Sequence, residues 1–208
     1  MQLDRPFRTV APTVDGDVLL ALARAEAAFT PPEVHRLIGE RSEAGVRKAL
    51  IRLAEQGVVD TERVGQAVTY RLNRQHLAAG PIIEIAHLRA TFLQRLRELL
   101  DSWDTPARFA ALFGSAAHGA MTIESDIDLF IVRPRRIDAD DSAWAALVGD
   151  LTAAVFRWTG NDARVLEYGE DEVDAGLRAS DRVLTDIADE GIVLHGPGRF
   201  LRRSRASV

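Results

Sequence analysis

The chain contains no cysteine, a single lysine and only 6% aromatic residues. Without cysteine it can form neither disulfides nor thiolate metal sites. No uninterrupted apolar stretch approaches the roughly 20 residues that a membrane span needs, and the polar N-terminus lacks a signal-peptide pattern. These absences favour a cytoplasmic protein with no membrane partner.

Net charge is −5 but is unevenly distributed along the 208 residues. Residues 1–80 carry a net charge of +1, whereas residues 104–208 carry −6. Nucleic-acid binding therefore cannot be argued from total charge and must be argued from local placement. The length allows one large domain or two small ones.

One stretch in the second half of the chain places polar residues between two apolar runs. Phe109–Phe113 precedes Gly114, and Leu129–Val132 follows Asp128, which predicts a strand, a tight turn, a short helix, a loop and a second strand. Asp126 and Asp128 are two positions apart, so they project side by side from the second strand. Such carboxylates repel each other unless a cation lies between them, and hard oxygen ligands suit Mg²⁺.

Gly114 and Ser115 fit the phosphate side of such a site. A glycine lets the backbone approach a phosphate closely, and the start of the following helix offers unpaired N–H groups to an anion. The Ser115 hydroxyl can add a donor. For the two aspartates alone, a solvated surface turn is an equal alternative, but the assembled pattern with flanking strands favours a site.

The spacing Gly-Ser-x3-Gly-x5-Ser-Asp-Ile-Asp-Leu resembles the signature of the polymerase-beta-like nucleotidyltransferase superfamily, especially its minimal (MNT-type) members. The resemblance implies an α+β domain with a small mixed sheet that uses Mg²⁺ and a nucleoside triphosphate, ATP being the first choice. It also implies transfer of a nucleoside monophosphate to an acceptor hydroxyl. The acceptor would lie on a HEPN-type toxin partner or on a small molecule.

The resemblance also implies a third acidic residue on the third core strand, and Glu167 matches that position. Alternation over residues 163–168 places Arg164 on one face of this strand and Glu167 on the other. We expect the Glu167 face to look toward the first two acids. The predicted metal-binding and catalytic residues are Asp126, Asp128 and Glu167.

Two further residues of the signature stretch are predicted to contact nucleotide, together with Gly114 and Ser115. They are His118, which could meet the triphosphate, and Ser125, which could bind a phosphate. Each has a plainer alternative: a lone histidine is more often structural or exposed, and Ser125 could instead cap its loop.

The first third of the chain has the pattern of helices followed by a hairpin. Asp17 is the expected N-cap of a first helix, Thr30 and Glu33 form a capping box for a second, and Ser42 caps a third. Alternating residues around Gly65 predict a β-hairpin. The order resembles a winged helix-turn-helix domain, similar to MarR- and ArsR-type DNA-binding regulators, over residues 15–77.

The third helix and its surroundings carry cations that could contact double-stranded DNA. The alternative is an ordinary solvated face. The predicted DNA-binding residues are Arg41, Arg47, Lys48, Arg52 and Arg63.

The remaining segments complete an α+β organisation in two domains. Residues 1–14 are expected to be a loose arm, and residues 81–103 a single connecting helix that is buried either between domains or in a homodimer. Residues 104–196 form the expected nucleotidyltransferase domain, which includes one long helix over residues 170–190. A basic tail with Arg199, Arg202, Arg203 and Arg205 is expected to be disordered.

Two functions follow from these patterns. The first is a Mg²⁺-dependent nucleotidyltransferase coupled to DNA binding. The second is a DNA-binding transcriptional regulator whose nucleotidyltransferase domain senses nucleotide without turning it over.

Overall fold

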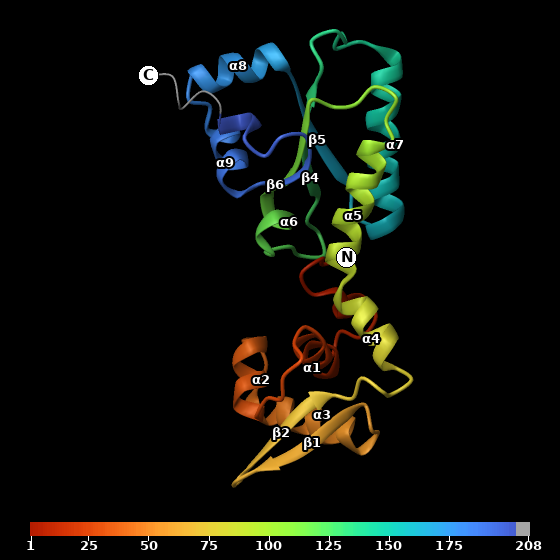
Figure 1. The fold of residues 1–208 in the computed structure, drawn as a ribbon, viewed down its shortest axis with the longest axis vertical. Coiled ribbons are helices and arrows are strands. Elements are labelled where there is room, and N and C mark those ends of the chain that lie inside the picture. Colours follow the sequence, from red (N-terminus) through yellow and green to blue (C-terminus); the bar gives the residue numbers. More distant parts are fainter. Residues whose placement is uncertain (203–208) are drawn as a thin grey trace. The chain divides into compact units, whose positions relative to one another are not determined.

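The computed structural model describes residues 1–202 and divides the chain into two compact units, shown in Figure 1. The first unit consists of residues 4–89 with Gln2, and the second begins at Ala90 and includes Met1 and Leu3. Within residues 1–202, no helix is long and apolar enough to cross a membrane.

The first unit is a helical bundle with a two-stranded hairpin. Its elements are η1 (Pro6–Thr9), α1 (Val14–Ala23), α2 (Pro31–Ile38), α3 (Glu43–Glu55), β1 (Val59–Val64), β2 (Ala67–Leu72) and α4 (Ala79–Ala86). Strands β1 and β2 pair antiparallel, and Gly65 in their turn has the positive φ of +63° that such a turn requires. The expected order of helices and hairpin is present, while the winged-helix interpretation stays a prediction.

Local sequence signals explain where α2 and α3 begin. The Thr30 amide donates to the Glu33 carboxylate over 2.7 Å, as the capping box requires. The Ser42 hydroxyl accepts from the Gly45 amide at the start of α3. The inward positions of α3 are buried at the spacing of one helix face, at Val46, Ala49, Leu50 and Leu53.

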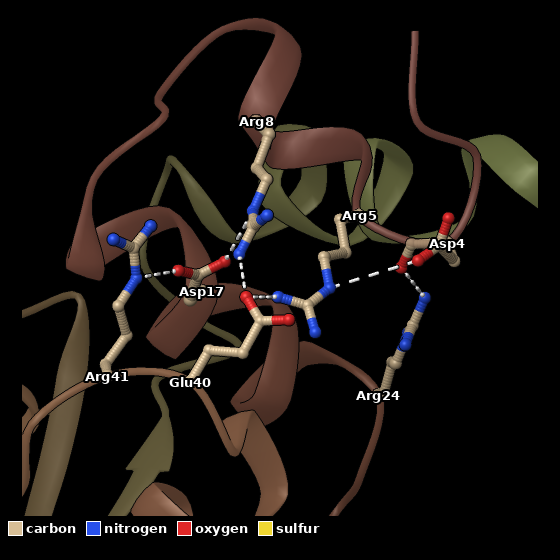
Figure 2. A network of polar contacts seen from close by, with 7 residues as sticks. All are labelled: Asp4, Arg5, Arg8, Asp17, Arg24, Glu40 and Arg41. Atoms are coloured by element: carbon tan, nitrogen blue, oxygen red, sulfur yellow. Dashed lines mark hydrogen bonds and ion pairs between the residues drawn. The ribbon is translucent and has the colours of Figure 1, made fainter. Parts of the chain in front are cut away.

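The N-terminal segment differs from its prediction. It is not a loose arm, because Leu3 and Phe7 are buried in the cores of the second and first units respectively. Asp17 is not an N-cap either, since α1 begins at Val14 and places Asp17 inside the helix, only 6% exposed. A buried carboxylate needs partners, and Figure 2 shows that Arg8 and Arg41 supply them.

The second unit is built on a four-stranded sheet in the order β5-β4-β3-β6. Its elements are α5 (Leu88–Asp101), β3 (Phe109–Phe113), α6 (Gly114–His118), β4 (Ile127–Arg133), α7 (Ser142–Thr159), β5 (Ala163–Gly169), α8 (Glu170–Arg178), α9 (Arg182–Glu190) and β6 (Ile192–His195). Strands β4 and β5 run parallel, whereas β3 is antiparallel to both of its neighbours.

Alternate residues of β4 enter two separate cores. Leu129 and Ile131 pack with residues of α5 and α7 on one face of the sheet. Phe130 and Val132 pack with residues of α8 and α9 on the other. Because side chains alternate along a strand, this assigns every residue of β4 to one face of the sheet. The register between β4 and β5 then assigns the residues of β5 in the same way.

Two expected helices are each divided in the structure. The connecting helix is interrupted at His87, between α4 and α5. The helix expected over residues 170–190 breaks at Ser180, whose φ is +56°, and Asp181 then caps α9 by accepting from the amides of Val183 and Leu184. The sequence reading missed this capping signal.

The start of the predicted disordered tail is ordered in the structure. Phe200 and Leu201 are buried in the core with α8 and α9, and Arg202 donates to the Ala188 carbonyl over 2.8 Å. The prediction is therefore wrong for residues 199–202, while Arg203 and Arg205 lie outside the described residues.

Candidate functional site

The turn between β3 and α6 is shaped by a carboxylate. Gly114 has a φ of +65°, and a Cβ at this position would overlap Oδ2 of Asp128. Phe113 and Asp128 are register partners across β3 and β4, which brings the carboxylate to the turn. The glycine is therefore required by its backbone conformation and by the close approach of Asp128.

Asp126 and Asp128 lie at the start of β4, on the same strand face, as the sequence predicts. Asp128 is half-buried, and desolvation raises the pKa of its carboxyl above the ordinary value. Arg164 acts in the opposite direction by lowering the pKa, and the charge of Asp126 raises it further. Burial and the neighbouring Asp126 carboxylate therefore both disfavour the charged form of Asp128.

Arg164, on the neighbouring strand β5, supplies a positive charge beside the two aspartates. It is the register partner of Asp128 on β5, and its Nε lies 2.6 Å from Oδ2 of Asp126. The Arg164 side chain is 77% exposed. The residue of the third core strand that lies beside the two aspartates is therefore a cation, which is the opposite of the predicted acid.

Glu167 lies on the other face of the sheet, so the prediction that it converges with the two aspartates is wrong. Its register partner is Ile131, which belongs to the core with α5 and α7. Glu167 Oε1 accepts from Arg133 Nη1, and Arg133 Nε donates to the Ile137 carbonyl over 2.9 Å. Glu167 also lies about 10 Å further along β5 than Arg164, at about 3.3 Å per residue.

The three other predicted nucleotide contacts have different environments. The hydroxyl of Ser115 has no hydrogen-bond partner in the described part of the chain, and is available to a ligand. Ser125 caps its loop, since its Oγ accepts from the Thr122 amide over 2.9 Å. His118 bridges the Gly114 carbonyl, at 2.7 Å, and the Glu190 carboxylate, at 2.5 Å, so its ring ties α6 to the end of α9.

The loop that carries Asp126 has a support that the sequence reading missed. Buried Asn161 donates from Nδ2 to the Ser125 carbonyl over 2.8 Å. Its Oδ1 accepts from the amino group of Met1, and burial lowers the pKa of that amino group. Asn161 directly follows Gly160, the C-cap of α7, but no sequence signal indicates the contact with Met1.

Two of the predicted DNA-binding residues are engaged within the first unit. Arg41 Nε donates to buried Asp17 over 2.6 Å, and Arg52 Nε donates to Asp15 over 3.1 Å. Arg41 is held inside the unit and is no longer part of the proposed DNA-contacting set.

Arg47 and Lys48 form the outward, exposed cations of α3. Arg47 has only a loose contact of 3.6 Å with Glu43. Arg63, beside the hairpin turn, donates from Nε to the Gly65 carbonyl over 3.4 Å. These three cations are available to a partner.

The two aspartates fit one Mg²⁺ ion, which proteins commonly hold by one or two carboxylates together with substrate phosphates. They do not form a three-carboxylate set, because Glu167 faces away. Within residues 1–202, no group of three or more histidine, aspartate or glutamate side chains is arranged to hold a metal.

Residues 94–195 match the family described as "Polymerase beta, Nucleotidyltransferase". The match assigns a nucleotidyltransferase-type domain to this part of the chain and agrees with the resemblance noted from the signature stretch. No curated protein matches the chain.

The solved structures that are similar to this chain include two toxin–antitoxin structures. One is described as a toxin–antitoxin with AMP-PNP, at 18% identity and a TM-score of 0.37. The other is a mutant of the toxin–antitoxin MntA-HpeT, at 16% identity and a TM-score of 0.36. Each alignment covers 55% of this chain and 84% of the other, so both likenesses are distant.

Proposed function

We propose that the protein transfers a nucleoside monophosphate from a Mg²⁺-bound nucleoside triphosphate, ATP first among them, to an acceptor hydroxyl. One observation carries the proposal. The carboxylate of Asp128 packs against Gly114. The two aspartates at the start of β4 and the unpartnered hydroxyl of Ser115 therefore lie at one turn. This proximity supports a site in which the carboxylates hold a metal and the hydroxyl donates to a phosphate, as does the match of residues 94–195 to a nucleotidyltransferase family.

Each residue of this edge has a proposed part. Asp126 and Asp128 would hold Mg²⁺, which when bound neutralises phosphate charge. Ser115 donates to a phosphate oxygen and fixes the triphosphate. The acceptor oxygen attacks the α-phosphorus, the bond to the β-phosphate oxygen breaks, and pyrophosphate leaves. Because Glu167 faces away, the acceptor proton passes to water or to a base on the acceptor molecule, and we expect slow transfer.

Arg164 takes part by exchanging partners. Its guanidinium pairs with Asp126 in the structure, so Asp126 must leave it to bind Mg²⁺. The freed guanidinium then stands beside the phosphates, where arginine can form charge-assisted hydrogen bonds to phosphate oxygens. The exchange is feasible because an exposed ion pair contributes only about 0–1 kcal/mol.

The test is incubation with radiolabelled nucleoside triphosphates, Mg²⁺ and purified candidate acceptors. A HEPN-type protein, which the resemblance to minimal nucleotidyltransferases implies, is the first acceptor to use. We expect label on the acceptor with the wild-type protein and none with Asp128→Asn. Equal labelling by wild type and Asp128→Asn would remove this edge from the reaction.

A second candidate function is a DNA-binding regulator that senses nucleotide without transferring it. Arg164 favours it, because a cation occupies the place beside the aspartates where the resemblance implies a third acid. The DNA-contacting face would be formed by Arg47, Lys48 and Arg63, with Arg52 joining if it leaves Asp15. In this case we expect no transfer, but a DNA affinity that changes when nucleotide is added.

DNA binding is tested by gel-shift titration at several salt concentrations. Alanine at Arg47 and at Lys48 should each weaken binding and lower the salt slope by about one per lost phosphate contact. Alanine at Arg74, an exposed cation of the same unit outside α3, is the matched control and should leave the slope unchanged. If Arg74→Ala lowers the salt slope as much as the α3 variants do, α3 is not the helix that contacts DNA. If the protein is a homodimer, its half-sites should lie about one helical turn, or a multiple of it, apart.

A further inference from the structure

A pocket of about 390 Å³ lies in the surface of the first unit. Its apolar lining consists of Leu20, Ala21, Ala25, Phe29, Leu37 and Ile38. Four charged residues complete the lining, namely Asp4, Arg5, Asp17 and Arg24. Leu37 is 59% exposed although it is a large apolar side chain. Concave apolar sites of this size that include a few polar groups are typical of small-molecule sites.

The charged side of this pocket belongs to the network in Figure 2, which contains four arginines and three carboxylates. Arg5 and Arg8 share Glu40, with distances of 2.6 and 2.7 Å. Arg8 and Arg41 share Asp17. Glu40 and Asp17 thus each pair with two arginines. The four arginines exceed the three carboxylates by one positive charge.

Arg24 is the arginine that lacks a carboxylate of its own. Its Nη2 donates to the backbone carbonyl of Asp4 over 2.9 Å, and no carboxylate of residues 1–202 lies within 4.0 Å of its guanidinium. Desolvation lowers the pKa of Arg24, while Asp4 raises it and Arg89 lowers it further. Arg24 is exposed at the pocket surface, and an anion beside it would offset the repulsion from Arg89.

We infer that this pocket binds a small organic carboxylate with an apolar body. The carboxylate pairs with Arg24, which has donors in the fork geometry that suits two carboxylate oxygens. The apolar body lies against Phe29, Leu37 and Ile38. Neither nucleotide transfer nor DNA binding is needed for this binding. If α3 binds DNA as proposed, an occupant in contact with the end of α2 would also affect the turn that precedes α3.

The test is a nuclear magnetic resonance titration of the isotope-labelled full chain with 1-naphthoate and with its neutral analogue, 1-naphthalenemethanol. We expect both to shift the signals of Leu37 and Ile38, and the acid to bind about tenfold more tightly because a charged hydrogen bond is added. Equal affinity for the two compounds, or no saturable shift up to about 10 mM, a concentration above the range of useful affinity, would overturn the inference.

Variants assign the charge preference to one residue. Arg24→Gln should lose the preference for the acid while keeping the affinity for the alcohol, and Arg24→Lys should retain part of the preference. Arg36→Gln removes an exposed arginine of α2 that does not line the pocket and should behave as wild type. A preference for the acid that survives in Arg24→Gln, or is lost equally in Arg36→Gln, would contradict the assignment. The comparison of the two compounds on the wild type does not depend on how any variant folds.

Discussion

Strands β4 and β5 are joined by two arginine–carboxylate pairs that differ in burial and therefore in their expected roles. Arg164 and Asp126 meet at the site edge, with side chains 77% and 23% exposed. Arg133 and Glu167 meet on the opposite face, with side chains 12% and 25% exposed. Water competes for the charged groups of the exposed Arg164–Asp126 pair and much less for those of the Arg133–Glu167 pair. Only the Arg164–Asp126 pair can therefore exchange partners at little cost in free energy.

We therefore interpret the Arg133–Glu167 pair as structural and propose that the Arg164–Asp126 pair takes part in ligand binding. The Arg133–Glu167 pair is also held by the hydrogen bond from Arg133 to the Ile137 carbonyl, so neither partner is free to meet a ligand. The Arg164–Asp126 pair lies beside Asp128 and Gly114, where a ligand can displace the guanidinium.

Removal of one partner of the part-buried Arg133–Glu167 pair should have the largest effect. Glu167→Ala leaves the part-buried Arg133 guanidinium without its carboxylate, and we expect a loss of about 2–3 kcal/mol in the free energy of unfolding, between the values for exposed and buried pairs. Replacing both residues with methionine should recover most of this loss. Urea unfolding measures both effects. A loss below about 1 kcal/mol for Glu167→Ala would mean that the pair behaves like an exposed one.

Gly114→Ala should destabilise the site edge by about 1–3 kcal/mol, because a non-glycine residue at positive φ is strained and its Cβ would overlap Asp128. Gly65→Ala is the matched control. Gly65 has a similar φ of +63°, but nothing lies within 4 Å of its Cβ position, so the loss should be smaller. Equal losses in thermal unfolding would show that the Asp128 contact contributes nothing.

Arg164→Ala should change the free energy of unfolding by less than about 1 kcal/mol. The same change frees Asp126, and we expect Mn²⁺ in the absence of nucleotide to bind about two- to fivefold more tightly in a spin-resonance titration, as loss of an exposed ion pair allows. Arg182→Ala removes another exposed arginine, one that pairs with Asp186, and controls for net charge. Weaker metal binding in Arg164→Ala would show that Arg164 assists the metal and does not compete with it.

The smallest effect concerns pH. Burial raises the pKa of Asp128 in the folded state, so the folded protein holds this proton more readily than the unfolded chain. The carboxyl group therefore lowers stability progressively as pH rises from about 4, the ordinary aspartate value, through the raised pKa. Metal-free Asp128→Asn should be more stable than wild type at pH 7, and the difference should vanish below about pH 4. A difference of equal size at both pH values would contradict this cause.

The sequence predicted those parts of the fold that depend on short-range signals. The capping residues Thr30 and Ser42 begin α2 and α3 as expected. The strand–turn–helix–strand order around Asp126 and Asp128 is also present. Each of these features is set by residues within a few positions of one another.

The failures depend on partners that are distant in the sequence. Alternation showed that Arg164 and Glu167 occupy opposite faces of β5, but it could not tell which face meets the aspartates, because that depends on the register between β4 and β5. Asp17 was predicted to be an N-cap because its partners, Arg8 and Arg41, come together only in the folded unit. The packing of Leu3 likewise has no local signal.

We propose that Mg²⁺–nucleotide binds where Gly114 and Asp128 meet and that Glu167 does not contact it. The most direct measurement is a calorimetric titration of Mg²⁺ with a non-hydrolysable ATP analogue into wild type, Asp128→Asn and Glu167→Gln, with folding checked by circular dichroism. Both variants replace one carboxylate by its amide and so match in charge. We predict that Asp128→Asn loses detectable binding, while Glu167→Gln stays within about twofold of wild type, a difference of less than about 0.5 kcal/mol. Binding lost in Glu167→Gln and retained in Asp128→Asn would contradict the account.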